Sequence, residues 1–170
     1  KGAEIAKAGN AEAIIAVGGG SPMDVAKSIG ILMTNGGNLD DYEGPHKYSK
    51  DPLPFLAIPT TAGTGTEVTP YAVITIRKRN YKMTIIGRNM LPKAALLDPT
   101  LLTSVPGPVA AACGVDVLTH AIESYTNLVA SPFTDACALE AIRVVGKYLR
   151  SYVADRRNLE SASGMLVANT

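Results

Sequence analysis

Cysteine is scarce in this sequence: Cys113 and Cys137 are the only two in 170 residues. Two cysteines are too few for a disulfide framework, so we expect a protein of the reducing cytoplasm. We interpret both as small buried apolar residues rather than as nucleophiles. A fold that depends on a disulfide framework is therefore not expected.

The sequence also lacks an excess of either charge, with 16 basic and 15 acidic residues. It has no basic stripe, no run of like charges and no apolar run as long as a membrane span. The first residues show no signal-peptide pattern. We therefore expect neither a nucleic-acid partner nor a membrane partner.

Neither end of the chain shows the signals of a complete protein. There is no initiator Met, and residues 1–7 are already typical of a helix. Residues 161–170 are apolar at helical spacing and lack a stop signal. We expect an internal fragment of a larger protein, which by itself would be catalytically inactive.

Short apolar runs predict a mostly parallel sheet in the first part of the chain. Residues 13–17 and 55–58 are continuous apolar runs followed by glycine or proline, which is typical of strands buried on both faces. Residues 94–97 predict a further strand. Between the first two runs we expect a helix to about residue 33, with Ser21 as its N-cap, and then a surface loop over residues 35–52.

A β-hairpin and a run of helices complete the predicted fold. Residues 71–76 and 82–86 are expected to pair around the polar turn at 77–80. After Pro106, residues 109–125, 134–154 and 158–170 are typical of helices. We therefore predict an α/β domain over residues 1–105, with a mostly parallel sheet and a hairpin, followed by the start of an all-α domain over residues 106–170.

Three glycines and a serine follow the first predicted strand. Glycine lets the backbone approach an anion closely, and the free amides and dipole of the helix that follows favour phosphate. The spacing matches neither the GxGxxG fingerprint nor a P-loop. A tight strand–helix turn with a capping serine is the alternative interpretation, and this motif by itself leaves both open.

A threonine-rich loop, residues 60–67, follows the second clear strand. Strands of a parallel sheet end at one edge, where ligands of α/β folds bind, so this loop is expected beside the glycine turn. Its hydroxyls can bind phosphate, ribose or amide groups. An internally hydrogen-bonded loop is the alternative. Considered together with the glycine turn, the loop favours a shared nucleotide cleft.

Asp116 and His120 lie four residues apart on a predicted helix and therefore share one face. A carboxylate and an imidazole so placed can bind one divalent cation. A plain Asp–His pair or a hydrogen-bonded core histidine is the alternative. His46, the other histidine, lies in the predicted surface loop, so any further ligands are expected beyond Thr170.

Four segments in order resemble the iron-containing, or group III, alcohol dehydrogenase family. Residues 18–27 are similar to the family's GGGSxxDxxK turn, and residues 59–69 to its PTTAGTGSE loop. Residues 97–99 match its short strand before the domain crossing. Residues 114–125 are similar to its GxDALxHAxExY metal helix. The resemblance runs over nearly the whole chain.

The resemblance implies a cofactor site and half of a metal site. The residues expected to contact NAD or NADP are Gly19, Gly20, Ser21, Asp24, Thr60, Thr61, Thr64, Val73 and Lys82. Asp116 and His120 would be the first two ligands of Fe²⁺ or Zn²⁺, with two histidines following on later helices. A lone strand lysine such as Lys82 is otherwise interpreted as solvated.

The function implied by the resemblance is metal-dependent transfer of a hydride between a small alcohol or aldehyde and nicotinamide, with the metal as Lewis acid. A homodimer is expected by resemblance only. Two other functions stay open. One is a non-catalytic nucleotide- or phosphate-binding module that needs no metal. The other is a lyase of the dehydroquinate synthase type, which shares the architecture but not the combination of glycine turn and threonine loop.

Overall fold

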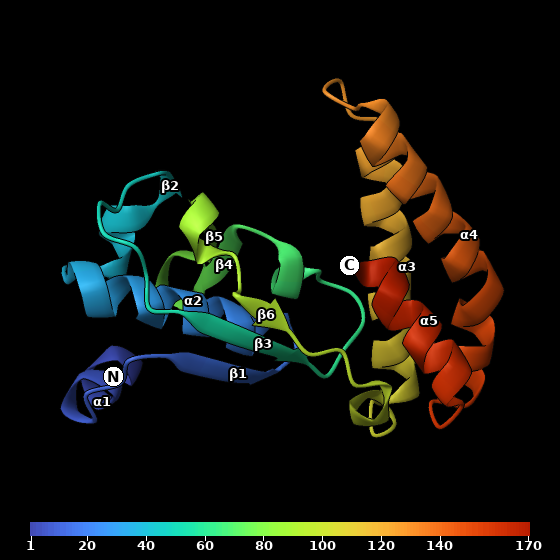
Figure 1. Cartoon of the computed structure of the whole chain (residues 1–170), viewed down its shortest axis with the longest axis horizontal. Coiled ribbons are helices and arrows are strands. Elements are labelled where there is room, and N and C mark those ends of the chain that lie inside the picture. Colours follow the sequence, from blue (N-terminus) through green and yellow to red (C-terminus); the bar gives the residue numbers. More distant parts are fainter. The chain divides into compact units, whose positions relative to one another are not determined.

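The computed structural model describes residues 1–170 and divides them into two compact units (Figure 1). The N-terminal unit comprises Lys1–Pro59 and Thr66–Leu96, and the helical unit comprises Thr60–Gly65 and Leu97–Thr170. The first six residues of the threonine loop therefore belong to the helical unit, and its last two, Thr66 and Glu67, belong to the N-terminal unit. None of the chain's helices combines the length and the hydrophobicity that a membrane span requires.

A three-stranded parallel sheet forms one layer of the N-terminal unit, in the order β1-β3-β6. Its elements, with the helices that precede and follow β1, are α1 (Gly2–Ala8), β1 (Ile14–Gly18), α2 (Gly20–Asn35), β3 (Phe55–Pro59) and β6 (Ala94–Ala95). Helix α2 connects β1 to the next strand of the sheet, as expected for a parallel crossover. The predicted parallel sheet is confirmed, with β6 shorter than predicted.

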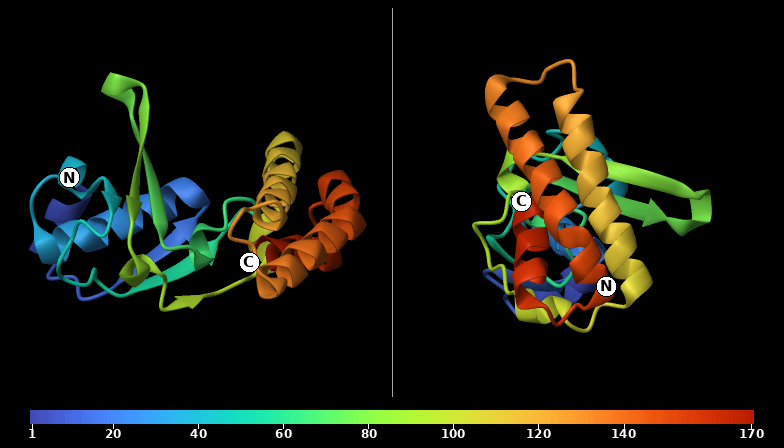
Figure 2. Two further views of the ribbon diagram at one scale, coloured as in Figure 1. Left: turned by 90° about the horizontal axis from the view of Figure 1, so that it is seen from above. Right: turned by 90° about the vertical axis from the view of Figure 1, so that its right-hand side faces the viewer.

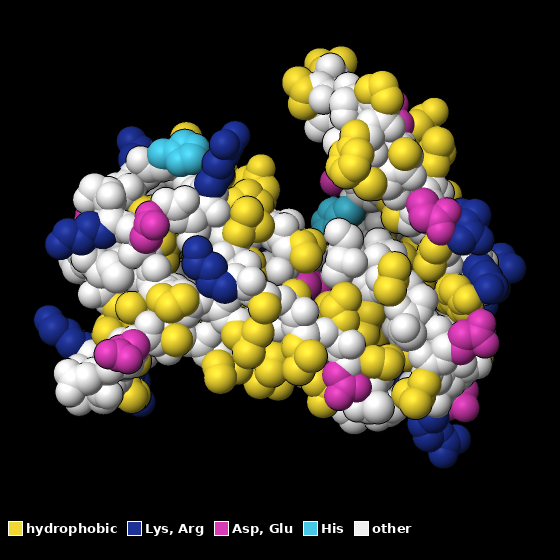
Figure 3. All heavy atoms as spheres, in the orientation of Figure 1, with side chains coloured by type: hydrophobic (Ala, Val, Ile, Leu, Met, Phe, Trp, Pro, Cys, Tyr) yellow, Lys and Arg dark blue, Asp and Glu magenta, His cyan; other side chains and the backbone are white.

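One face of this sheet is covered and the other is open. Met23 and Ala26 of α2 pack with Ala16, Phe55 and Ala57 of the strands in one buried cluster. On the opposite face, the β1 side chains Ile15 and Val17 are 66% and 56% exposed, and hydrophobic atoms gather there (Figure 3). The prediction that residues 13–17 are buried on both faces is therefore wrong for this chain, because the N-terminal unit packs α2 against one face only.

The second sheet of the N-terminal unit has the order β2-β5-β4 and contains the predicted hairpin. Its strands are β2 (Gly44–Pro45), β4 (Tyr71–Ile76) and β5 (Tyr81–Ile86). The hairpin is a two-stranded arm (Figure 2), and its turn ends at Asn80 in the left-handed conformation with φ 46°. Asparagine tolerates this conformation better than most residues. Ala72, Met83 and Ile85 anchor the hairpin on Ile31 of α2.

Short 3-10 helices occupy several connections. They are η1 (Leu39–Tyr42), η2 (Thr66–Val68), η3 (Arg77–Arg79), η4 (Arg88–Met90) and η5 (Pro99–Leu102). The predicted loop over residues 35–52 therefore contains η1 and β2. Such one-turn helices are common as connectors.

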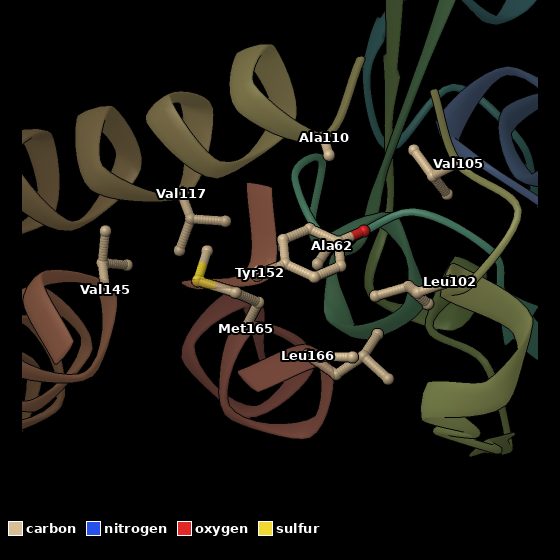
Figure 4. Close-up of a cluster of buried hydrophobic side chains, with 10 residues drawn as sticks. Ala62, Leu102, Val105, Ala110, Val117, Val145, Tyr152, Met165 and Leu166 are labelled. Atoms are coloured by element: carbon tan, nitrogen blue, oxygen red, sulfur yellow. The ribbon is translucent and has the colours of Figure 1, made fainter. Parts of the chain in front are cut away.

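The helical unit consists of η5 and three helices, α3 (Gly107–Tyr125), α4 (Pro132–Ala154) and α5 (Leu159–Asn169). Its core joins all three helices through Val117, Val145, Tyr152 and Met165 (Figure 4). Ala62 of the threonine loop lies among these side chains. The run of helices predicted after residue 106 is confirmed.

The two compact units divide at Leu96 and Leu97. This division lies before the predicted domain boundary at residues 105/106, because η5 packs with α5 and Leu102 lies in the helical core. The prediction of domains over residues 1–105 and 106–170 concerns the intact protein and stays a prediction.

Candidate cofactor and metal sites

The glycine turn joins β1 to α2. Gly18 has φ +153°, and a Cβ there would lie 2.7 Å from Cγ of Pro22, so the backbone conformation and the packing both require glycine. Helix α2 begins at Gly20, with Gly19 as N-cap and no side-chain cap hydrogen bond. Ser21 therefore lies inside the first turn, and its prediction as N-cap is wrong. Because no side chain caps this helix, its first amides are available to an anion.

The glycine turn and the threonine loop leave the same edge of the sheet. β1 and β3 are parallel and in register from Ile14 opposite Phe55 to Gly18 opposite Pro59. The two strands therefore end side by side, and residues 19 and 60 begin from neighbouring positions. This is the edge at which ligands of α/β sheets bind.

The threonine loop approaches helix α3 at Gly63. A Cβ on Gly63 would lie 2.7 Å from Cβ of Cys113 and 2.9 Å from its Cα, so only glycine allows this contact. Cys113 is half-buried, and burial together with Asp116 raises the pKa of its thiol. Asp116 follows Cys113 by three residues on α3, about one helical turn. The loop carrying Thr60, Thr61 and Thr64 therefore packs one turn from the predicted metal pair.

Val73 and Lys82 lie on one face of the hairpin. Val73 pairs with Thr84, and Lys82 pairs with Thr75, so all four side chains point to the same side of the two strands. This is the exposed side, whereas Ala72, Met83 and Ile85 on the other side are buried. Both residues are therefore accessible to a ligand.

A buried polar group joins α2 to η2, and we call it the Lys27 cluster (Asp24, Lys27 and Glu67). Of its members only Asp24 was predicted as a site residue. Lys27 is only 2% exposed. Its Nζ donates hydrogen bonds to the backbone carbonyls of Thr66 at 2.7 Å, Thr69 at 2.7 Å and Tyr71 at 2.8 Å.

Asp24 and Glu67 complete the cluster. Asp24 Oδ2 accepts a hydrogen bond of 3.1 Å from the backbone N–H of Val73, so two predicted cofactor residues meet directly. Glu67 is buried and lies close enough for its charge to act on Lys27. The sequence signal for this cluster was the pair of charged residues, three apart, on an otherwise apolar helix face.

Burial governs the ionisation of the cluster. It lowers the pKa of Lys27 to about 8, against the charges of Asp24 and Glu67, which raise it. Burial also raises the pKa of Asp24, and the Val73 N–H, the Lys27 charge and Thr66 act in the opposite direction. With a pKa of about 8, Lys27 is mostly protonated at neutral pH. The ammonium then has the three N–H donors that its three carbonyl partners accept.

The predicted metal pair lies on the solvent-accessible surface of α3. Nε2 of His120 is 3.8 Å from Oδ1 of Asp116, and the two side chains are 50% and 47% exposed. That separation is too long for a hydrogen bond. Two ligands of one metal lie roughly 3–3.5 Å apart, so a small side-chain rotation would suit both atoms to one cation. No group of three or more potential metal ligands occurs in the chain, so these residues fit as part of a coordination sphere.

A cavity of about 540 Å³ adjoins His120. Its walls come from all three helices, with His120 and Ser124 from α3, Cys137 and Glu140 from α4, and Asn169 from α5. Cavities of this size hold small ligands. Cys137 is exposed, so its prediction as a buried residue is wrong, because its position on α4 faces this opening.

Two family models match the chain. The model described as iron-containing alcohol dehydrogenase matches residues 1–99. The model described as Fe-containing alcohol dehydrogenase family, C-terminal, matches residues 110–170. The residues between the two matches contain most of η5 and the start of α3.

Curated relatives match over almost the whole chain. Alcohol dehydrogenase 4 of Schizosaccharomyces pombe is 44% identical over 168 residues, which is 99% of this chain and 40% of that protein. NAD-dependent methanol dehydrogenase of Bacillus methanolicus is 40% identical over 168 residues, 99% of this chain and 44% of that protein. The chain thus spans less than half the length of these relatives.

Solved structures show the same fold. A 1,3-propanediol oxidoreductase superposes with a TM-score of 0.94 at 38% identity, covering 98% of this chain and 44% of that one. Sulfoacetaldehyde reductase from Bifidobacterium kashiwanohense, in complex with NAD+, has a TM-score of 0.92 at 39% identity, covering 98% of this chain and 46% of that one.

Proposed function

The chain belongs to the iron-containing alcohol dehydrogenase family, and we propose that the protein containing it transfers a hydride between a small alcohol or aldehyde and a nicotinamide dinucleotide, with a divalent metal at Asp116 and His120. The observation that carries this proposal is the position of the Asp116–His120 pair. It lies on the helix against which the threonine loop packs at Gly63, and His120 lines the cavity.

The cofactor would bind along the edge at which β1 and β3 end. Gly19, Gly20 and Ser21 would hold the pyrophosphate, supported by the first turn of α2, which no side chain caps. Asp24 would lie nearby. The relatives named as NAD-dependent or solved with NAD+ favour NAD over NADP.

The remaining cofactor contacts would come from the threonine loop and the hairpin. Thr60, Thr61 and Thr64 would line the nicotinamide half, with Val73 and Lys82 at further contact positions. In support, Gly63 holds this loop against α3 within one turn of Asp116. Val73 and Lys82 share an exposed hairpin face.

The metal would be held by an Asp oxygen and a His nitrogen, donors that suit Fe²⁺ and Zn²⁺, and the family's name favours iron. When bound, it would polarise the substrate oxygen as a Lewis acid. The cavity beside His120 would hold the substrate, whose apolar part would contact Val117, Ala121 and Val144.

The substrate would be a short molecule with a hydroxyl or aldehyde group. Relatives are named for methanol, 1,3-propanediol, choline and sulfoacetaldehyde, all of which are small. Assembly as a homodimer and a cytoplasmic location stay predictions.

The test is turnover by the intact protein with a panel of short alcohols and NAD, followed by nicotinamide absorbance. Asp116→Asn and His120→Gln should each lower kcat/KM roughly a thousandfold or more, since a Lewis acid contributes several kcal/mol. NAD affinity should be retained. Glu12→Gln, which changes an exposed acid outside the cavity and outside the four motifs, is the control and should leave turnover unchanged.

Two results would overturn the proposal. Full turnover after removal of the metal, or in both variants, would exclude the metal pair. NAD binding without oxidation of any alcohol by the metal-loaded protein would favour the binding module. A redox-neutral elimination catalysed with bound NAD would instead favour a lyase of the dehydroquinate synthase type.

A further inference from the structure

Three backbone carbonyls converge on the ammonium of Lys27. They belong to Thr66, Thr69 and Tyr71, which lie in η2, in the turn that follows it and at the first position of β4. The segment between η2 and β4 thus bends around one side-chain atom of α2. The three distances, 2.7, 2.7 and 2.8 Å, are short for N–H···O bonds, as charge-assisted hydrogen bonds are.

These bonds leave Lys27 no donor for a ligand. An ammonium has three N–H groups, and each has one carbonyl partner here. The side chain is also 2% exposed. To bind a cofactor phosphate, Lys27 would have to release a carbonyl and leave it unsatisfied in a buried place, which is costly. Lys27 therefore acts on the protein's own backbone.

Asp24, about one turn before Lys27 on α2, also binds this segment. It is 8% exposed and accepts the backbone N–H of Val73, two residues after the last carbonyl that Lys27 binds. One helix thus holds residues 66–73 through three carbonyls and one amide. Burying a lysine costs desolvation energy that burying an apolar residue would not, and the hydrogen bonds to three carbonyls of one segment offset this cost.

We propose that Lys27 is a positioning residue that holds residues 66–73 in the shape required for cofactor binding, by fastening the end of the threonine loop and the start of the hairpin to the helix that follows the glycine turn. This inference rests on the proposed function, since the segment joins Thr64 to Val73, both proposed to contact the cofactor. Lys27 itself does not touch the cofactor. It acts through the backbone that carries those residues.

The experiment compares Lys27→Met and Lys27→Arg in the intact protein, with Lys7→Met, an exposed lysine on α1, as the matched control. Calorimetry measures the dissociation constant of NAD, steady-state kinetics separates the KM for NAD from kcat, and hydrogen exchange follows amides 66–73.

Lys27→Met should raise the NAD dissociation constant and KM about tenfold or more, because several charge-assisted hydrogen bonds are lost. At saturating NAD, kcat should change much less, and exchange should accelerate at residues 66–73 but not in β1 or β3.

Lys27→Arg should give an intermediate loss, because a guanidinium keeps the charge but cannot direct three N–H bonds from one nitrogen. It also keeps the test decisive where Lys27→Met does not fold.

Unchanged NAD affinity and unchanged exchange at residues 66–73 in a folded variant would overturn the inference. A large loss of kcat with unchanged NAD affinity would also overturn it. Absence of NAD binding by the unmodified protein would instead count against the proposed function, and the exchange measurement would still decide whether Lys27 holds the segment.

Discussion

The two units each contain a polar group built on one helix, and the two groups differ in what surrounds them. In the N-terminal unit, Lys27 is 2% exposed and each of its donors has a backbone partner. In the helical unit, Asp116 and His120 are about half exposed, and their nearest oxygen and nitrogen atoms are 3.8 Å apart. The hydrogen-bond donors of Lys27 are all satisfied within the protein, whereas Asp116 and His120 are accessible to a ligand.

This difference distinguishes a polar group that stabilises the fold from one that can bind a ligand. Buried polar groups stabilise a fold only when their hydrogen bonds are satisfied internally, and then they have nothing left for a ligand. Exposed groups at ligand spacing contribute little to stability and are free to bind. Helical spacing alone, three residues in one case and four in the other, does not distinguish the two situations.

The largest expected effect on stability tests this difference directly. Asp24→Ala removes the acceptor of the Val73 N–H and a charge that offsets Lys27, so it should lower the free energy of unfolding by about 3 kcal/mol. Asp116→Ala removes only an exposed pair and should change it by less than about 0.5 kcal/mol. Urea unfolding of the intact protein measures both. Equal losses in the two variants would remove the distinction between the groups.

A second, smaller effect concerns the contact that holds the threonine loop on α3. Gly63→Ala would place a Cβ 2.7 Å from Cβ of Cys113, and such overpacking should cost about 1–3 kcal/mol. It should also raise the KM for NAD, because the shifted loop carries Thr61 and Thr64. Gly146→Ala, in the middle of α4, has open space and should stabilise by about 0.5–1 kcal/mol.

One result with the glycine variants would contradict the proposed role of the contact between Gly63 and Cys113. If Gly63→Ala leaves both the urea midpoint and the KM for NAD unchanged, the loop does not depend on its contact with Cys113. The coupling between the loop and the metal helix would then have to be abandoned.

The smallest expected effect compares two serines near helix starts. Ser131 caps α4 through a reciprocal hydrogen-bonded pair with Thr134, so Ser131→Ala should cost about 1 kcal/mol. Ser21 caps nothing, so Ser21→Ala should cost less than about 0.5 kcal/mol. Its effect should instead appear as weaker NAD binding. Thermal unfolding with and without NAD distinguishes a capping role from a binding role for each serine, and a stability loss at Ser21 equal to that at Ser131 would contradict this assignment.

Local patterns predicted most of the fold. The apolar runs that became β1 and β3, the hairpin around Asn80 and the three C-terminal helices are signals carried by neighbouring residues, and they lie close to their predicted positions. The predictions that failed concern a helix start and the burial of side chains. Ser21 was predicted as the N-cap from its neighbours, whereas the N-cap of α2 is Gly19, two residues earlier. The exposure of Ile15 and Val17 depends on which element packs against their face.

Some features of the candidate site could likewise be predicted from the sequence, and others could not. The glycine turn, the threonine loop and the Asp116–His120 spacing are visible in the sequence because each is a short run of residues. The roles of Lys27 and Gly63 are not, because each depends on a partner about 40 or more residues away in the chain, at Thr66 for Lys27 and at Cys113 for Gly63.

The sequence by itself determined the type and order of the elements, the family and the residues expected at the cofactor and the metal. Only the tertiary structure decided which polar groups are satisfied by the protein and which stay open, and why Gly63 must be glycine. The physical reason is that periodicity and turn chemistry act between neighbours, whereas burial and hydrogen-bond satisfaction depend on groups that folding brings together.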